Sequence, residues 1–123
     1  MKTRTDKDFI KSYYQGTELL LHQILAYIQN HYQEDITLRE MAQSLGYEEH
    51  FISRRFNNFF HKNFKQFINE RRIHSAKYLL AAKDSELTMT DIAYQCGFQS
   101  VRNFNRVFRN IMGYPPSKSN QKR

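Results

Sequence analysis

The chain carries the stretch TLREMAQSLGY at residues 37–47, and a related stretch, TMTDIAYQCGF, follows at residues 88–98. The two align without gaps at an offset of 51 positions, which marks an internal repeat. Each copy begins with Thr and has an acidic residue three positions later, the pattern of a helix capping box, with the Asp91 version weaker than the Glu40 version. Each copy ends in Gly and an aromatic residue, which can close a helix through the left-handed conformation and fold back onto it. The repeat therefore predicts two short helices that end in the same kind of turn.

An amphipathic helix is expected after each turn, because apolar residues recur there on one helical face at 3.6 residues per turn. After Gly46 they are Phe51, Ile52, Phe56, Phe59 and Phe60, and after Gly97 they are Phe104, Val107, Phe108 and Ile111. Helix, Gly turn and amphipathic helix form the helix-turn-helix pattern. The sequence therefore predicts an all-α fold with two helix-turn-helix units.

Two further helices are expected to support these units. Residues 17–32 should pack beneath the first unit through Leu20, Leu21, Ile24, Leu25 and Ile28. Asn63 with Gln66 resembles another capping box, which opens a helix to about residue 82 with a face that includes Phe64, Phe67, Ile68, Ile73, Ala76, Leu79 and Leu80. This helix links the two units, so if continuous it is a rigid spacer between them.

The expected organisation has five parts, and Pro115-Pro116 is expected to start a last short helix or to end the fold. The parts are an N-terminal extension or interdomain segment (1–16), a first helix-turn-helix subdomain (17–62), a linker helix (63–83), a second helix-turn-helix subdomain (84–118) and a C-terminal tail (119–123).

The positive charge is concentrated in one part of the chain. Residues 1–47 carry five basic and six acidic side chains, whereas residues 48–123 carry fourteen basic and six acidic ones. Such an uneven excess favours a polyanionic partner.

The single cysteine cannot form an internal disulfide, and neither a signal peptide nor an apolar run of the ~20 residues needed to span a bilayer is present, so we expect a soluble, cytoplasmic protein.

Catalysis has no supporting motif, so we expect no enzyme, no cofactor and no metal. The five histidines, His22, His31, His50, His61 and His74, form no pair at metal-site spacing. Cys96 lies in an apolar position, which favours a buried structural thiol. Only four glycines are present, and no phosphate-binding glycine loop is found among them.

The polar face of each amphipathic helix carries the candidate site. All eight residues on the two faces have side chains that can form hydrogen bonds: His50, Ser53, Arg54 and Asn57 in the first, and Arg102, Asn105, Arg106 and Arg109 in the second. Arg can donate two hydrogen bonds to guanine, and Asn matches the edge of adenine. A solvated polar face is the ordinary alternative for one helix, but two equivalent faces after two equivalent turns favour reading of a DNA major groove.

With these motifs, the chain resembles the DNA-binding domain of the AraC/XylS family of bacterial transcription regulators over residues 18–118. Phe67–Ile73 with Ala76, Leu79 and Leu80 looks like the linker helix of that family. The family signature is matched by Asp91-Ile92-Ala93, Cys96-Gly97-Phe98, Ser100, Phe104, Arg106, Phe108 and Gly113-Tyr114-Pro115-Pro116.

The resemblance implies about seven helices in a homeodomain-like arrangement, with recognition helices near 49–60 and 101–111 that enter successive major grooves. It implies base contacts by His50, Ser53, Arg54, Val101, Arg102, Asn105 and Arg106, with Val101 near a thymine methyl group. The expected phosphate contacts are Arg55, Asn57, Lys62 and Arg109, with Lys65, Arg71 and Arg72 as further candidates.

The first unit departs from the family pattern in two places, and the end of the chain in a third. His61 stands where a Gly is usual, and Glu48 and Glu49 replace a small N-cap and bring negative charge to the end of the helix that faces the groove. Ser119-Asn120 stands where Tyr-Arg is frequent, which predicts a short final helix.

These observations predict a sequence-specific double-stranded DNA-binding module that regulates transcription, as the C-terminal part of a longer effector-responsive protein. RNA polymerase is a candidate partner, and a small-molecule effector is expected only if a separate domain exists. The alternatives are an all-helical basic protein-interaction module and an RNA-binding module. The RNA alternative is disfavoured because the A-form major groove is too narrow for a helix.

Overall fold

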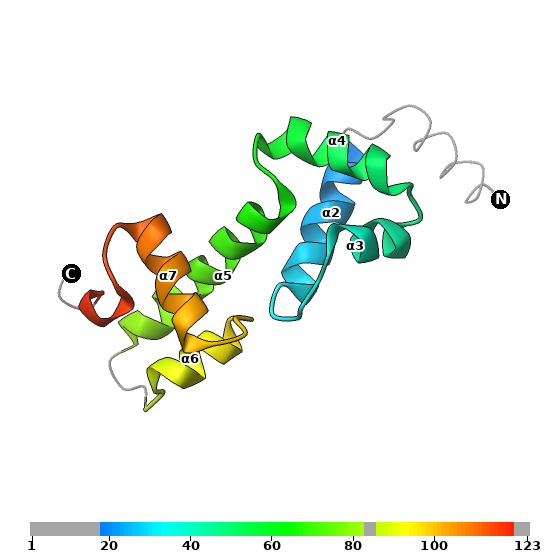
Figure 1. Ribbon diagram of the computed structural model, residues 1–123. Helices are drawn as coiled ribbons and strands as arrows, with labels where there is room; N and C mark the ends of the chain where they lie inside the picture. The colour runs from blue at the N-terminus through cyan, green and yellow to red at the C-terminus, as the bar shows by residue number, and fades with distance from the viewer. Residues whose placement is uncertain (1–17, 83–85, 120–123) are drawn as a thin grey trace.

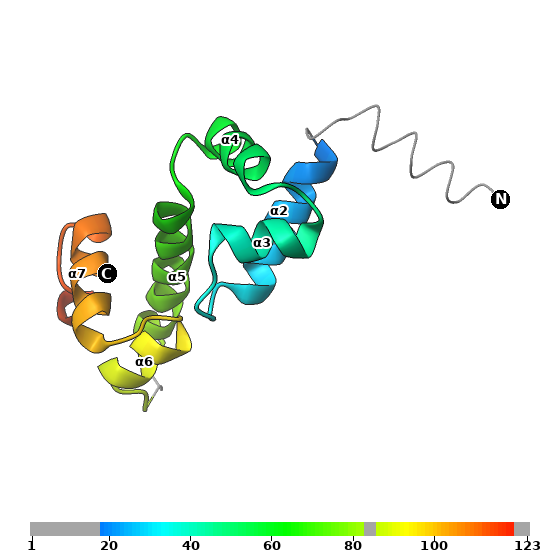
Figure 2. The same ribbon diagram turned by 45° about the vertical axis from the view of Figure 1, so that its right-hand side comes forward.

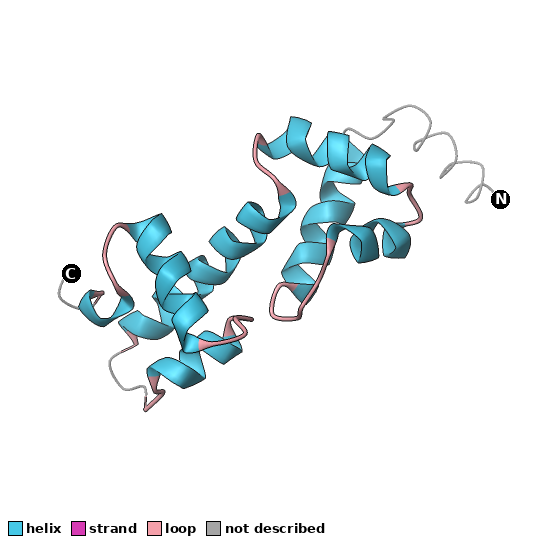
Figure 3. Ribbon diagram, viewed as in Figure 1, coloured by secondary structure: helices cyan, strands magenta, loops and turns pink. Residues whose placement is uncertain are grey.

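The computed structural model describes residues 18–82 and 86–119, and this part of the chain is helical with no strand (Figures 1 and 3). The all-α prediction is confirmed, and the expected number of about seven helices is close. The predicted N-terminal segment 1–16 and residues 120–123 of the predicted tail lie outside the described residues. The elements are α2 (Glu18–His31), α3 (Leu38–Leu45), α4 (Glu49–Phe60), α5 (Phe64–Ala81), α6 (Met89–Gln95), α7 (Val101–Met112) and a 3-10 helix, η1 (Pro116–Lys118).

Two hydrophobic cores lie at the two ends of α5, the long helix between them (Figure 1). The first core joins α2, α3 and α4, and α5 enters it through Ile68. The second core joins α6 and α7, and α5 enters it through Ile73, Ala76 and Leu80. Because one continuous helix contributes to both cores, it sets the separation of the two helix-turn-helix units.

Two side chains that the helical pattern placed in the cores are in fact exposed. Leu25 is 39% exposed and Ile111 is 40% exposed. On α2 the buried line is Leu20, Ile24 and Ile28 at four-residue spacing, and Leu25 lies one position further around the helix. On α7 the buried residues are Phe104, Val107 and Phe108, so Ile111 lies a turn beyond them.

The turns after α3 and α6 have the same hydrogen bonds, as the repeat predicts. The N–H of Tyr47 donates to the carbonyl of Ala42 (2.9 Å), and at the equivalent place the N–H of Phe98 donates to the carbonyl of Ala93 (3.0 Å). Gly46 and Gly97 have φ of 83° and 101°, the left-handed conformation that glycine enters without strain. Both capping boxes are complete, with Glu40 and with Asp91, so the weaker motif in the second copy forms as well.

The connection between α4 and α5 contains His61, where the sequence departs from the family pattern, and a capping box that forms only in part. His61 ends α4 with φ 58°, so it adopts the left-handed conformation that a Gly would take, and its N–H donates to the Asn57 carbonyl (2.8 Å). Asn63 Oδ1 accepts from the N–H of Gln66 (2.8 Å), as predicted. The Gln66 side chain, however, donates to Glu70 one turn later, so the predicted capping box is only half formed.

Candidate nucleic-acid interface

The polar face of α7 is open to solvent along its length. Arg102, Asn105, Arg106 and Arg109 are all exposed, and the helix begins at Ser100, whose hydroxyl accepts from the N–H of Asn103 (3.0 Å). The Arg106 guanidinium donates to the Asn103 side-chain carbonyl (2.6 Å), a contact three positions apart on one helical face. We call these four exposed side chains the second stripe and the equivalent set on α4 the first stripe. The second stripe is rich in hydrogen-bond donors, and Asn103 already orients one of its members, Arg106.

The polar face of α4 is less basic and carries a carboxylate at its start. His50, Arg54 and Asn57 are exposed, and Ser53 is half-buried. The Glu48 side chain caps the helix by accepting from the N–H of Phe51 (3.1 Å). Hydrogen bonds from the N–H groups of His50 and Phe51 lower the pKa of Glu48, and the positive charge of Arg54 acts in the same direction. The first stripe thus begins with a fixed negative charge, whereas the second begins with a neutral serine.

Two grooves connect the stripes through the N-terminal half of α5. The groove beside α4, of about 450 Å³, is lined by Ser53 and Asn57 among others. The groove beside α7, of about 410 Å³, is lined by Arg106 and Asn110 among others. Both grooves share Asn63, the N-cap of α5, and Lys65 and Asn69 on α5, so the two stripes border one surface that α5 divides.

The predicted phosphate contacts differ in how available their side chains are. Asn57 and Arg109 are exposed. Lys62 is half-buried and bonds to Glu70 (2.6 Å), and the Arg55 guanidinium lies 4.9 Å from the centre of the Phe51 ring. A phosphate contact by Lys62 would therefore have to compete with a carboxylate that already neutralises its charge.

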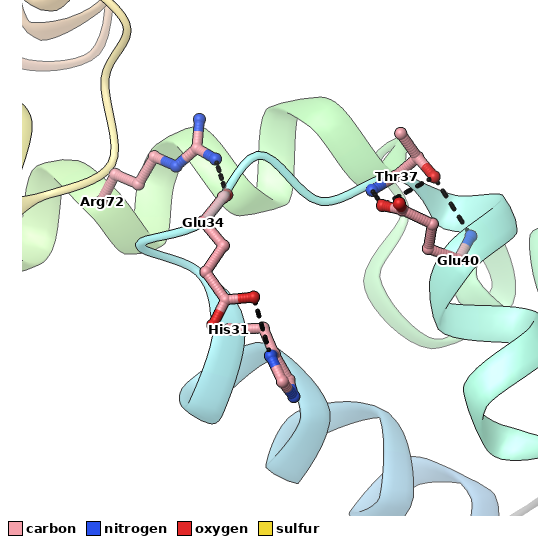
Figure 4. A network of polar contacts seen from close by, with 5 residues as sticks. All are labelled: His31, Glu34, Thr37, Glu40 and Arg72. Atoms are coloured by element: carbon pink, nitrogen blue, oxygen red, sulfur yellow. Dashed lines mark hydrogen bonds and ion pairs between the residues drawn. The ribbon is translucent and has the colours of Figure 1, made fainter.

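Arg71 and Arg72, two of the further phosphate candidates, are turned to contacts within the protein. Arg71 donates twice to the Gln29 side chain, and Arg72 donates to the backbone carbonyls of Tyr32 and Glu34. Figure 4 shows the contact between Arg72 and Glu34. A phosphate contact by either arginine would therefore have to compete with these hydrogen bonds, which occupy two donors of each guanidinium. Lys65, the remaining candidate, is exposed on the shared surface of α5.

Sequence reasoning did not single out three asparagines that belong to this surface. Asn69 and Asn110 line the grooves, and Asn103 holds Arg106. For Asn103 a signal was available, because it precedes Arg106 by three positions on a predicted helix. Asn69 had no such signal, because its place depends on how α4 and α7 pack against α5.

Val101, a predicted base contact, is half-buried and packs on the second core.

Other kinds of site find little support in the part of the chain that the structure describes. There, no group of three or more His, Cys, Asp or Glu side chains is arranged to hold a metal. Burial raises the pKa of the Cys96 thiol, against a weaker opposing effect of its hydrogen bond with Ser75. None of the helices in residues 18–82 and 86–119 has the length and apolar character required to cross a membrane.

Comparison with known proteins assigns the family. A family model described as a helix-turn-helix domain matches residues 19–122. The chain belongs to this helix-turn-helix family. The solved structure of a probable AraC family transcriptional regulator from Rhodopseudomonas palustris is 26% identical with a TM-score of 0.72, over 82% of this chain and 94% of that one. The AraC-type assignment made from the motifs is thereby confirmed, and the family is one of transcription regulators rather than of enzymes.

Two further proteins resemble this chain, one in sequence and one in fold. An uncharacterized HTH-type transcriptional regulator of Staphylococcus aureus is 35% identical over 98 residues, which are 80% of this chain and 13% of that protein. The chain thus spans about an eighth of the length of this helix-turn-helix relative. The DNA-binding domain of AdpA, a global transcriptional factor solved in complex with a target DNA, shares the fold with a TM-score of 0.74 at 22% identity, over 83% of this chain and 90% of that one.

Proposed function

We propose that this AraC-type domain binds specific double-stranded DNA through α4 and α7, which enter successive major grooves, and so regulates transcription. The observation that carries the proposal is the pair of exposed, hydrogen-bonding stripes on α4 and α7, which follow equivalent turns and border one surface. A major groove admits an α-helix and presents a distinct set of donors and acceptors for each base pair. The fold shared with a domain solved on its target DNA supports this reading.

The residues proposed to contact bases are those of the two stripes near the helix N-terminal and central turns. Arg102 and Arg106 suit guanine, Asn105 suits adenine, and His50, Ser53 and Arg54 can serve several bases. The part of the Val101 side chain that is not packed on the second core is proposed to contact a thymine methyl group. The proposed phosphate contacts are Arg55, Asn57, Lys62 and Arg109, to which the position of Lys65 on α5 adds a fifth.

The two units are proposed to contribute unequally to affinity. The second stripe carries three arginines and begins at a neutral cap, whereas the first carries one arginine and begins at the Glu48 carboxylate with Glu49 beside it. Negative charge at that end repels phosphate. The second unit therefore supplies more of the attraction to DNA. The proposed limits are residues 17–62 for the first subdomain, 63–83 for the linker helix and 84–118 for the second subdomain.

For the whole protein, we propose a cytoplasmic regulator in which this domain is the C-terminal module. The support for a longer protein is that the Staphylococcus aureus relative is much longer than the segment it shares with this chain. A small-molecule effector would then bind a separate domain, and RNA polymerase is a candidate partner in activation. No catalytic step is proposed.

A salt titration with labelled duplexes tests the DNA proposal against the alternative of a basic protein-interaction module. A random 30-bp duplex and an A-form RNA duplex of the same length are compared by fluorescence anisotropy. DNA affinity should fall linearly on a log–log plot, with a slope of roughly −0.9 for each phosphate neutralised. Duplex DNA should bind more tightly than RNA, because only its major groove admits α4 and α7. Weak binding to both, with no salt dependence, would favour the protein-interaction module.

A further inference from the structure

The two helix-turn-helix units touch each other directly, and Arg72 of α5 lies at the meeting point. Its Nε donates to the carbonyl of Tyr32 and its Nη2 to the carbonyl of Glu34, each at 2.8 Å. Both carbonyls belong to the loop after α2, in the first unit. The Arg72 guanidinium also lies 5.8 Å from the centre of the Phe98 ring, in the second unit. One side chain of the linker helix thus contacts both units.

Gly97 brings the second unit against the same loop. A Cβ atom at Gly97 would lie 2.7 Å from the Tyr32 carbonyl oxygen, 2.9 Å from Arg72 Nε and 3.0 Å from Gln33 Cα. Figures 1 and 2 both show the turn after α6 beside the loop after α2. Gly46, the equivalent residue of the first unit, has nothing within 4 Å of its Cβ position. The close approach at Gly97 therefore belongs to the contact between units and is not a general need of the turn.

Tyr32 is held on three sides at this junction. It is buried in the first core, its hydroxyl donates to Ser75 (3.1 Å), and its ring lies 4.1 Å from the Arg71 guanidinium carbon. The Ser75 side chain also acts on the Cys96 thiol of the second unit, whose pKa it lowers against the larger effect of burial. Arg72 itself is half-buried, and this burial lowers the pKa of its guanidinium. We use the name interunit junction for Tyr32, Arg72, Ser75 and Gly97.

We propose that the interunit junction fixes the distance and angle between α4 and α7, with Arg72 as the positioning residue, so that the protein selects the spacing of two DNA half-sites. This inference rests on the proposed DNA-binding function. The linker helix α5 joins the units because it enters both cores, so without another contact a bend of this one helix would change the angle between them. The junction adds a second point of attachment, so the two units cannot pivot independently.

The consequence for DNA is a spacing requirement. One added base pair moves a half-site by about 3.4 Å along the axis and turns it by roughly a tenth of a helical turn. Two recognition helices on a rigid frame cannot both follow that change. Two recognition helices on a flexible frame can follow that change with little loss of affinity.

The test is a spacing series measured with wild type and two charge-matched variants. The probes are duplexes that carry the two half-motifs selected by the wild-type protein, with spacers from three base pairs shorter to three longer. Arg72→Ala removes the junction donor. Lys77→Ala removes one positive charge from an exposed position on the same helix, and serves as the control.

Wild type and Lys77→Ala should lose about tenfold or more in affinity for a one-base-pair change, comparable to a mismatched base pair. Arg72→Ala should lose only about threefold, because one unit can turn to follow the groove. Its response to base changes within either half-motif should stay as in wild type, which a variant that had merely unfolded could not show. An equally sharp spacing profile in Arg72→Ala would overturn the inference, whereas failure of the wild type to select two half-motifs would overturn the proposed function itself.

A distance measurement without DNA keeps the inference testable if the variant binds poorly. Spin labels at Asn58→Cys on α4 and Asn110→Cys on α7, both exposed positions, report the separation of the two helices by pulsed electron spin resonance. The buried Cys96 should stay unlabelled. We expect a narrow distribution in the parent and in Lys77→Ala, and a broader one in Arg72→Ala and Arg72→Lys. Identical distributions in all four would overturn the inference.

Discussion

The Arg106 guanidinium donates a 2.6 Å hydrogen bond to the Asn103 side chain, which holds it on the exposed face of α7. An arginine oriented in this way loses less side-chain freedom when it binds a base. Arg106→Ala should weaken binding to the preferred duplex by about 1–3 kcal/mol and relax the sequence preference at one position. Asn103→Ala should act in the same direction with a smaller loss. Competition assays against a panel of single-base variants measure both effects, and unchanged discrimination by Arg106→Ala would exclude a base contact.

Arg109, further along the same stripe, is expected to contact phosphate and therefore to behave differently. Arg109→Ala should weaken binding to all duplexes by a similar factor, and the slope of log affinity against log salt should become shallower by about 1. Lys65→Ala should do the same from α5. The measurement is a salt titration on the preferred and on a scrambled duplex. A loss confined to the preferred sequence would show that Arg109 reads bases.

Capping of α4 by Glu48 predicts a pH dependence of stability. Because the pKa of Glu48 is lowered in the folded protein, its charge stabilises the fold above the ordinary glutamate value near 4.5, and this effect is lost as the pH falls through the lowered value. Glu48→Gln should therefore melt below wild type at pH 7, and the difference in melting temperature should narrow as the pH falls below the ordinary glutamate value. Glu49→Gln removes a neighbouring charge that makes no capping hydrogen bond, and serves as the charge-matched control. A difference in melting temperature between Glu48→Gln and wild type that stays constant from pH 7 to pH 3 would argue against the charged cap.

The two turn glycines should differ in how they tolerate alanine. Gly46→Ala meets only backbone strain, a cost of about 1–2 kcal/mol for a residue in the left-handed region. Gly97→Ala meets the same strain and the close contacts with Tyr32 and Arg72, so it should lose roughly a further 1–3 kcal/mol. Urea unfolding of both variants gives the comparison. Equal losses would mean that the loop after α2 moves aside without cost.

Local features of the fold were predictable because their causes lie within a few residues. The capping boxes at Thr37 and Thr88 and the Gly turns are encoded by neighbouring positions, and they locate α3 and α6. The stripes on α4 and α7 follow from helical periodicity alone.

The remaining features depend on contacts between distant parts of the chain. The sequence made Arg72 a candidate phosphate contact, and only the folded structure shows its donors on carbonyls 40 and 38 positions earlier. Leu25 fitted the apolar stripe of α2, yet the partner helices do not reach it. Gly97 was understood as a turn residue, whereas its contact with Tyr32 needs both units in place.

Selection of bound duplexes from a random DNA pool shows most directly whether α4 and α7 both read sequence. If they do, the enriched duplexes should contain two distinct half-motifs whose centres lie about one helical turn, ~10 bp, apart. Arg106→Ala should degrade one half-motif and Arg54→Ala the other. Enrichment of a single half-motif, or of no sequence at all, would contradict a domain with two recognition helices.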